Sequence, residues 1–188
     1  TFYSISNCQE GLSRVTLGNF LIKRVVFEIQ EELPNIKNFG TLSPIPGFRN
    51  WYMNLDENTA KNILGNIPLG NISFLKSSSL KIGDTRILSN KNAIYKLVAH
   101  YLMNEKNQKQ LPINDVCRFH LGNGAIIDDI VINANISEVG FNRSFGVMVN
   151  YLYELKNIEK NHEEYINNKT TIISLSLIHI SEPTRRDQ

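Results

Sequence analysis

The stretch that decides the fold lies at the start of the chain, in residues 2–32, FYSISNCQEGLSRVTLGNFLIKRVVFEIQEE. Residues 2–6 are rich in aromatic and β-branched side chains, which favour a strand. After a polar stretch, apolar residues recur with a helical period over residues 20–32 and predict a helix. Asn19 is a suitable N-cap for this helix, and Pro34 is a stop signal. The chain is therefore predicted to begin with a strand, a loop and a helix.

The charges on this helix oppose its own dipole. Lys23 and Arg24 lie near its start and glutamates lie near its end, whereas the reverse arrangement is the stabilising one. An anion held by the loop at residues 13–19 would explain the cations, because a helix N-terminus offers unpaired N–H groups. A solvated helix with ordinary surface charge is the simpler explanation from spacing alone.

The rest of the chain mixes strands and helices without internal repeats. A strand predicted at residues 39–42 ends at the stiff run Ser43-Pro44-Ile45-Pro46-Gly47. Helices are predicted at residues 91–104, capped by Asn90, and at residues 159–168, where coil is the alternative. Further strands are predicted at residues 116–121, 125–132 and 146–153, the first two joined by a hairpin at Asn123-Gly124. This interleaving indicates a mixed α and β class.

Composition narrows the class of protein. The 188 residues are 41% hydrophobic, enough for a folded core, and the formal net charge of +2 argues against a general nucleic-acid binder. The longest apolar run, at residues 172–180, is too short to span a bilayer. Two cysteines cannot build a disulfide framework, so a reducing cytoplasm is the simplest location. No metal-ligand, phosphate-loop or nucleophile-elbow motif occurs, and any chemistry must come from a less regular site.

Two local features outside the first helix could carry chemistry. Ser43 follows a strand on a backbone stiffened by prolines, which would hold its hydroxyl in place; a structural turn is the simpler interpretation.

In the strand predicted at residues 116–121, Arg118 and His120 would share one face, opposite Cys117. His120 could exchange a proton near neutral pH, and a structural histidine is equally consistent. Neither Cys117 nor Cys8 has a base partner in the sequence, so both are predicted to be inert thiols.

Several uncommon strings occur in the same order as in one enzyme family. They are FYSIS at residues 2–6 with Gln9 and Gly11-Leu12, LGNFLIK at 17–23, LSPIPGF at 42–48, Tyr101-Leu102 with Asn104-Glu105-Lys106, RFHLGNGA at 118–125 and GVMVNYLY at 146–153. Together they cover most of residues 2–165, and the chain resembles the malonyl-CoA decarboxylase family. The resemblance implies an α+β, acetyltransferase-like (GNAT-like) acyl-CoA-binding fold. Its central mixed sheet would be flanked by helices and incomplete at its N-terminal side.

The resemblance also implies a reaction, the decarboxylation of malonyl-CoA to acetyl-CoA and CO₂ without a metal or organic cofactor. The family's catalytic serine and histidine fall on Ser43 and His120, and a supporting tyrosine falls on Tyr153. The loop that binds CoA phosphates falls on Ser13, Arg14, Val15, Thr16, Leu17, Gly18 and Asn19. We expect the Ser43 hydroxyl and the His120 ring to meet in one pocket beside the start of the first helix.

The same resemblance implies malonyl-CoA as the partner, and the charge balance and the short apolar run predict no nucleic acid and no membrane. The full-length protein is expected to be a homo-oligomer in a bacterial cytoplasm. Two other functions stay open: an acyl-CoA N-acyltransferase on the same fold, and a non-catalytic CoA-binding or assembly fragment. An acyltransferase would need an amine acceptor and a base, and it would not need Ser43 paired with His120.

The end of the chain is predicted to be foreign to the fold. Residues 175–185, LSLIHISEPTR, resemble the translation of a sequencing adapter. Residues 1–173 are therefore assigned to the C-terminal part of the catalytic domain, and residues 174–188 to a non-native tail. His179 is accordingly not a candidate ligand or catalyst.

Overall fold

The computed structural model describes residues 17–174 and Leu177. The chain divides into two compact units, residues 1–39 and residues 40–188. The strand predicted at residues 2–6 lies outside the described residues.

The described part of the first unit is dominated by helix α1 (Leu17–Glu32). This helix begins at Leu17 rather than at residue 20, so Asn19 lies inside it and is not its N-cap. The Leu33 N–H donates to the Ile29 carbonyl at 2.8 Å and Pro34 follows, which confirms the predicted end. Arg24 and Glu28 form an exposed ion pair at 2.8 Å, which contributes little in water.

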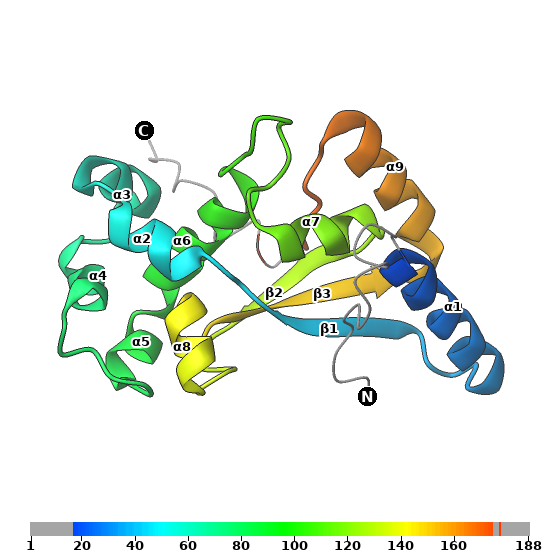
Figure 1. The fold of residues 1–188 in the computed structure, drawn as a ribbon, viewed down its shortest axis with the longest axis horizontal. Coiled ribbons are helices and arrows are strands. Elements are labelled where there is room, and N and C mark those ends of the chain that lie inside the picture. The colour runs from blue at the N-terminus through cyan, green and yellow to red at the C-terminus, as the bar shows by residue number, and fades with distance from the viewer. Residues whose placement is uncertain (1–16, 175–176, 178–188) are drawn as a thin grey trace, which may run out of the picture. The chain divides into compact units, whose positions relative to one another are not determined.

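The second unit is built around a three-stranded sheet in the order β1-β3-β2, in which neighbouring strands run in opposite directions (Figure 1). The strands are β1 (Asn38–Pro44), β2 (Ile126–Val131) and β3 (Met148–Glu154). Ile127 of β2 pairs with Tyr151 of β3, and the register shifts at a bulge between Ile127 and Asp129. On its other side, β2 forms a parallel bridge from Ile127 to Ile173. The strands predicted at residues 39–42, 125–132 and 146–153 are therefore confirmed.

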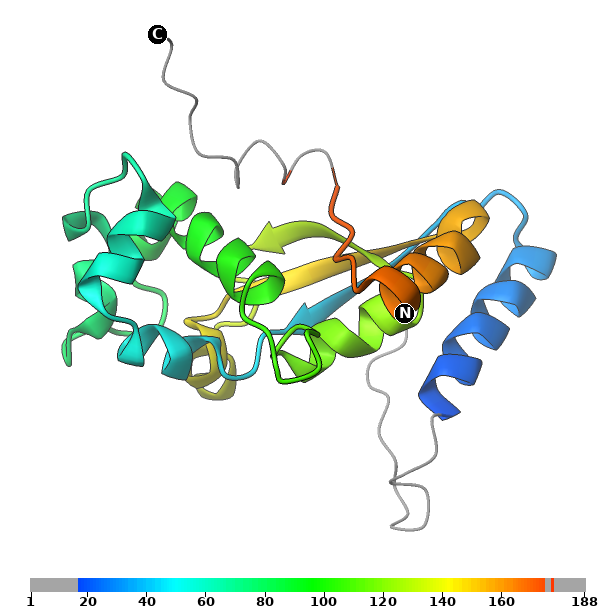
Figure 2. The ribbon, with the colours of Figure 1, turned by 90° about the horizontal axis from the view of Figure 1, so that it is seen from above.

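Helices surround the sheet. They are α2 (Phe48–Asn54), α3 (Glu57–Leu64), α4 (Gly70–Ser73), α5 (Thr85–Ser89), α6 (Lys91–Met103), α7 (Asp115–Gly122), α8 (Glu138–Ser144) and α9 (Ile158–Asn168), with 3₁₀ turns at Phe74–Lys76 and Leu155–Asn157. Figure 2 shows α2 to α6 and α8 beyond one end of the sheet, whereas α7 packs on the sheet next to α9. No helix among the described residues is long and apolar enough to cross a membrane. The helices predicted at residues 91–104 and 159–168 are confirmed as α6 and α9.

The strand predicted at residues 116–121 is wrong, because these residues lie in helix α7. The Asn114 side chain caps the helix by accepting a hydrogen bond from the Cys117 N–H at 2.8 Å. At the other end, the Gly124 N–H donates to Leu121 and the Ala125 N–H donates to His120, the two bonds of a Schellman cap. Gly124 has the positive φ that this cap requires, +81°, so the predicted hairpin at Asn123-Gly124 is instead a helix end.

Beyond the sheet, an aromatic cluster fills the space between α2, α6 and α8. Its members are Phe48, Trp51, Tyr52, Tyr101, Phe141 and Phe145. Phe145 meets Phe48 at 6.2 Å and Tyr52 at 6.0 Å between ring centroids, both edge to face. The guanidinium of Arg49 lies 4.8 Å from the centre of the Phe141 ring. This cluster packs α2, α6 and α8 against one another.

The last described residues pack beside β2. The Ser174 N–H donates to the Ile127 carbonyl at 2.9 Å, and Leu177 is buried. The assignment of residues 174–188 to a non-native tail stays a prediction, and most of that segment lies outside the described residues.

Candidate active site

Ser43 lies at the end of β1, where the strand enters a rigid turn. Its side chain is 7% exposed, and the next residues on the buried side, Ile45 and Phe48, are fully buried. Gly47 makes the turn with a φ of +84°, and a Cβ atom there would lie 2.8 Å from the Tyr101 hydroxyl oxygen. The sequence predicted Ser43 on the turn after the strand, whereas the structure places it inside β1, one residue before the strand ends at Pro44.

His120 lies in the last turn of α7 and faces the sheet. Cys117, His120 and Leu121 are buried and share the face expected for positions three and four apart on a helix. Arg118 points elsewhere and donates to the carbonyls of Pro112 and Ile113 at 2.7 and 2.8 Å. The prediction that Arg118 and His120 share a strand face is therefore wrong.

Ser43, His120 and Tyr153 are joined by hydrogen bonds. The Ser43 Oγ lies 2.9 Å from His120 Nε2, and His120 Nδ1 lies 2.7 Å from the Tyr153 hydroxyl. Tyr153 is 2% exposed on β3, and His120 is 5% exposed. The structure thus brings together a strand-end hydroxyl, a helix imidazole and a strand phenol that lie 77 and 33 residues apart in sequence. Their catalytic roles stay a prediction, as does the expected nearness of the start of α1.

The hydrogen bond from Ser43 to Thr41 determines where the hydrogens lie between Ser43, His120 and Tyr153. Ser43 donates its single hydroxyl hydrogen to Thr41 Oγ1 at 3.3 Å. It therefore accepts from the N–H at His120 Nε2, and Nδ1 then accepts from the Tyr153 hydroxyl. This tautomer is inferred from the network of partners. Every group in the chain is satisfied, and the hydrogens point from Tyr153 towards Ser43.

Burial keeps both titratable groups of the chain neutral. Desolvation lowers the pKa of His120 from 6.5 to about 4. Desolvation also raises the pKa of Tyr153 well above its ordinary value of 10.0. At neutral pH, the site therefore presents an uncharged imidazole between two hydroxyl groups.

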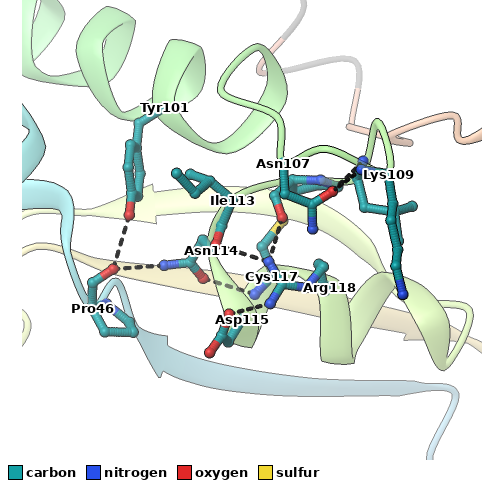
Figure 3. Close-up of polar contacts among 11 residues, drawn as sticks. Pro46, Tyr101, Asn107, Lys109, Ile113, Asn114, Asp115, Cys117 and Arg118 are labelled. Carbon is teal, nitrogen blue, oxygen red and sulfur yellow. Dashed lines mark hydrogen bonds and ion pairs between the residues drawn. The ribbon is translucent and has the colours of Figure 1, made fainter.

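A polar brace holds the two chain segments of the site together, as Figure 3 shows. The Pro46 carbonyl accepts from Asn114 Nδ2 at 2.9 Å and from the Tyr101 hydroxyl at 3.0 Å. Asn114 is 2% exposed and also caps α7, so one side chain links the turn after Ser43 to the helix that carries His120. Sequence reasoning missed this residue, although an Asn-Asp pair before an amphipathic run is a helix-start signal.

Tyr151 is a second residue that sequence reasoning left without a role. Its ring stacks on the His120 ring with centroids 4.3 Å apart and planes 20° apart. Strand alternation places Tyr151 and Tyr153 on one face of β3, and both are buried. The alternation along the strand already places the two tyrosines together in the sequence, but the stacking on His120 was not predicted.

The predicted CoA loop is described only in part. Ser13, Arg14, Val15 and Thr16 lie outside the described residues, and the backbone of Leu17, Gly18 and Asn19 forms the first turn of α1. Their role stays a prediction.

The other groups that could carry chemistry are the cysteine thiols and the side chains that could bind a metal ion. Burial raises the pKa of the Cys117 thiol to about 12, which confirms an inert thiol there, and Cys8 lies outside the described residues. Within the described part of the chain, no three His, Cys, Asp or Glu side chains form a group that could hold a metal ion.

These features define an α+β protein with a buried serine–histidine–tyrosine site of the kind suited to proton transfer. The family model of the malonyl-CoA decarboxylase C-terminal domain matches residues 1–187. The chain belongs to that family.

Named relatives agree with this assignment. The mitochondrial malonyl-CoA decarboxylase of Mus musculus is 34% identical over 197 residues, which cover 95% of this chain and 40% of the relative. The corresponding protein of Anser anser anser is 37% identical, covering 89% of this chain and 37% of the relative.

Solved structures agree as well. The crystal structures of malonyl-CoA decarboxylase from Cupriavidus metallidurans and Agrobacterium vitis are 35% and 34% identical, with TM-scores of 0.78 and 0.80. They are matched over 95% and 96% of this chain and over 47% and 44% of their own length. The chain thus spans less than half the length of these relatives.

Proposed function

We propose that this chain forms the catalytic part of an enzyme that decarboxylates malonyl-CoA to acetyl-CoA and CO₂. The observation that carries the proposal is the hydrogen-bonded chain from Ser43 through His120 to Tyr153, with bonds of 2.9 and 2.7 Å, in a member of this family. The reaction needs one group that orients the malonyl unit and another that protonates carbon. The hydroxyl of Ser43 and the imidazole of His120 are groups of these two kinds.

Ser43 orients the malonyl unit in this proposal. Its hydroxyl hydrogen, now donated to Thr41, turns to an oxygen of the bound thioester when substrate arrives. When the bond between the α-carbon and the carboxylate breaks, CO₂ leaves and its electron pair moves into the thioester carbonyl. A fixed donor aimed at that oxygen stabilises the negative charge that develops there.

His120 protonates the carbon. The N–H at Nε2 lies at the Ser43 end of the ring and is transferred to the enolate carbon, which completes the acetyl group. Nδ1 takes the phenol proton of Tyr153 as the Nε2 proton leaves, so the ring stays neutral. Nδ1 then returns its proton to Tyr153 as Nε2 takes up a proton from solvent, which restores the starting tautomer. One proton is consumed in each turnover, and the neutral ring agrees with the pKa of about 4.

No metal or organic cofactor takes part in the proposed reaction, because the thioester carbonyl itself accepts the electrons. The proposal is tested by prolonged dialysis of the full-length enzyme against a chelator. Unchanged kcat is the expected result, and activity restored by one added metal ion would contradict it.

The CoA portion is proposed to bind at Ser13–Asn19, with its phosphates at the start of α1, on an acetyltransferase-like (GNAT-like) fold. The resemblance in sequence supports this part of the proposal, and a helix N-terminus can bind a phosphate through its unpaired N–H groups. The cations Lys23 and Arg24 do not add support, because α1 begins at Leu17 and places them beyond its first turn. Gly18→Val should raise the KM for malonyl-CoA, because a side chain there blocks close approach of the backbone to a phosphate. An unchanged KM in a folded variant would contradict the loop assignment.

The direct test of function is CO₂ release from malonyl-CoA by the full-length protein, with acetyl-CoA measured in parallel. Stoichiometric CO₂ and acetyl-CoA are expected. Acylation of an added amine without CO₂ release would favour an N-acyltransferase, and binding without turnover would favour a CoA-binding fragment. A homo-oligomer of the full-length protein, tested by light scattering, and a bacterial cytoplasm as its location stay predictions.

A further inference from the structure

The plane of the His120 ring needs a physical cause. The torsion that turns an imidazole about its Cβ–Cγ bond has a broad energy profile, so the side chain itself does not choose one plane. The bonds from Nε2 to Ser43 and from Nδ1 to Tyr153 hold two points on the ring edge. Hydrogen bonds tolerate a spread of angles, so these two contacts still leave the ring some rotation about its Cβ–Cγ bond. A contact on the ring face narrows this rotation further.

Tyr151 supplies the contact on the ring face. Its ring lies 4.3 Å from the His120 ring at 20°, whereas Phe119 and Tyr153 meet the imidazole at 78° and 68°. Tyr151 is 1% exposed, so it cannot move aside into solvent. A buried flat ring parallel to the imidazole resists rocking, because a tilted imidazole would overlap it or open a void.

Tyr151 is itself held by the helix that carries His120. Its hydroxyl interacts with the thiol of Cys117, which lies one turn before His120 on α7. On the other side, Tyr151 belongs to β3 and lies two residues before Tyr153. The face contact and the Nδ1 contact therefore come from the same rigid strand.

We propose that Tyr151 is a positioning residue for His120, whose ring sets the imidazole plane so that Nε2 meets Ser43 while Nδ1 meets Tyr153. The kinetic part of this inference rests on the proposed decarboxylation. The structural part concerns the ring of His120 alone and is independent of the substrate.

Three variants of the full-length protein separate the ring from the hydroxyl. Tyr151→Phe keeps the ring, and its kcat should stay within about threefold of the wild type. Tyr151→Leu removes the ring and should lower kcat by about 10²-fold, the usual cost of a misplacement near 1 Å, with little change in the KM for malonyl-CoA. Tyr151→Met is a second ring-free variant with a flexible side chain that fills irregular gaps. Tyr52→Leu, a buried tyrosine of the aromatic cluster, is the matched control and should leave kcat unchanged.

A measurement without substrate decides the structural part. The ¹⁵N shifts of the His120 ring report which nitrogen carries the proton. We expect one tautomer, protonated at Nε2, in the wild type and in Tyr151→Phe, and averaged shifts in Tyr151→Leu or Tyr151→Met. This result would stand even if the protein released no CO₂.

Two results would overturn the inference. One is a folded ring-free variant that keeps both the wild-type kcat and the single tautomer. The other is a loss of kcat in Tyr151→Phe as large as in the ring-free variants, because the hydroxyl of Tyr151, and not its ring, would then hold His120 in place. If neither ring-free variant folds, a loss of kcat of about 10²-fold in Tyr151→Phe would still overturn the inference.

Discussion

Two buried regions of this protein use tyrosine in different ways. In the aromatic cluster, the hydroxyls of Tyr52 and Tyr101 donate to the backbone carbonyls of Ile72 and Pro46 at 2.8 and 3.0 Å. In the candidate site, the Tyr153 hydroxyl bonds to a ring nitrogen of His120 at 2.7 Å. A carbonyl can only accept, so its tyrosine has one state and contributes only stability. An imidazole nitrogen can accept or donate, so its tyrosine also decides where a proton lies.

The largest expected difference between the two regions is in turnover, and it concerns His120. His120→Asn removes the group that passes a proton to carbon, and kcat for CO₂ release should fall by about 10²–10⁴. The variant should stay folded, because the change opens no large cavity. Circular dichroism checks the fold, and Tyr52→Phe is the control that should keep its kcat. A folded His120→Asn variant with wild-type kcat would remove His120 from the mechanism.

The two regions should also differ in their response to pH. The folded protein holds the pKa of His120 at about 4, below the unfolded value near 6.5, so the unfolded state binds more protons between these values. The stabilisation from neutral His120 is therefore complete above about pH 6.5 and is lost as the pH falls towards 4. At most about 3 kcal/mol is involved.

Denaturant unfolding between pH 7 and pH 4 measures this effect, with His120→Asn as the control that cancels all other groups. We expect the wild type to lose more stability than His120→Asn across this window. Equal losses in the two proteins would show that burial does not depress the pKa of His120.

A substitution of Ser43 is the next test of the difference between the candidate site and the aromatic cluster. Ser43→Ala removes a hydroxyl but leaves the packing of the turn intact, and kcat should fall by about 10²-fold, as for a lost oxyanion donor. The KM for malonyl-CoA should change less than kcat, because the bond strengthens in the transition state. A rise in KM with unchanged kcat would instead mean that Ser43 contributes only to binding.

The Pro46 carbonyl joins the two regions, because it accepts from Tyr101 of the cluster and from Asn114 of the site. Asn114→Ala removes a buried donor and the cap of α7, and should lower the free energy of unfolding by about 2 kcal/mol. Tyr101→Phe removes the other donor and should cost about 1 kcal/mol. Only Asn114→Ala should also lower kcat in the folded protein. Equal kcat in both variants would mean that the brace does not position His120.

The smallest change in stability is also the most direct comparison of the two tyrosine environments. Tyr153→Phe and Tyr52→Phe each remove one buried hydroxyl, and each should lower the free energy of unfolding by about 1 kcal/mol. Only Tyr153→Phe should lower kcat, by about 10²-fold, because Nδ1 would then have no proton donor when Nε2 gives up its proton. A matching fall in Tyr52→Phe would show that kcat follows general stability instead.

Much of the secondary structure could be predicted because its patterns are local. The alternation around Tyr151 and Tyr153 predicted β3, and the helical spacing of apolar residues predicted α6. Helix α7 was mistaken for a strand because its eight residues make barely two turns, and over so short a run alternation and helical spacing look alike. The Asn-Asp pair at its start was the signal that could have corrected this.

The sequence by itself determined the proline-stiffened backbone that follows Ser43, the alternation that puts Tyr151 and Tyr153 on one strand face, and the order of strings that resembles one family. Those features depend on residues close together in the chain. Only the tertiary structure decided that Ser43 lies 2.9 Å from His120, that Tyr151 stacks on that ring, and that the imidazole is neutral. Contacts across 77 residues and the loss of solvent around a side chain arise from the packing of α7 on the sheet, and no local pattern encodes that packing.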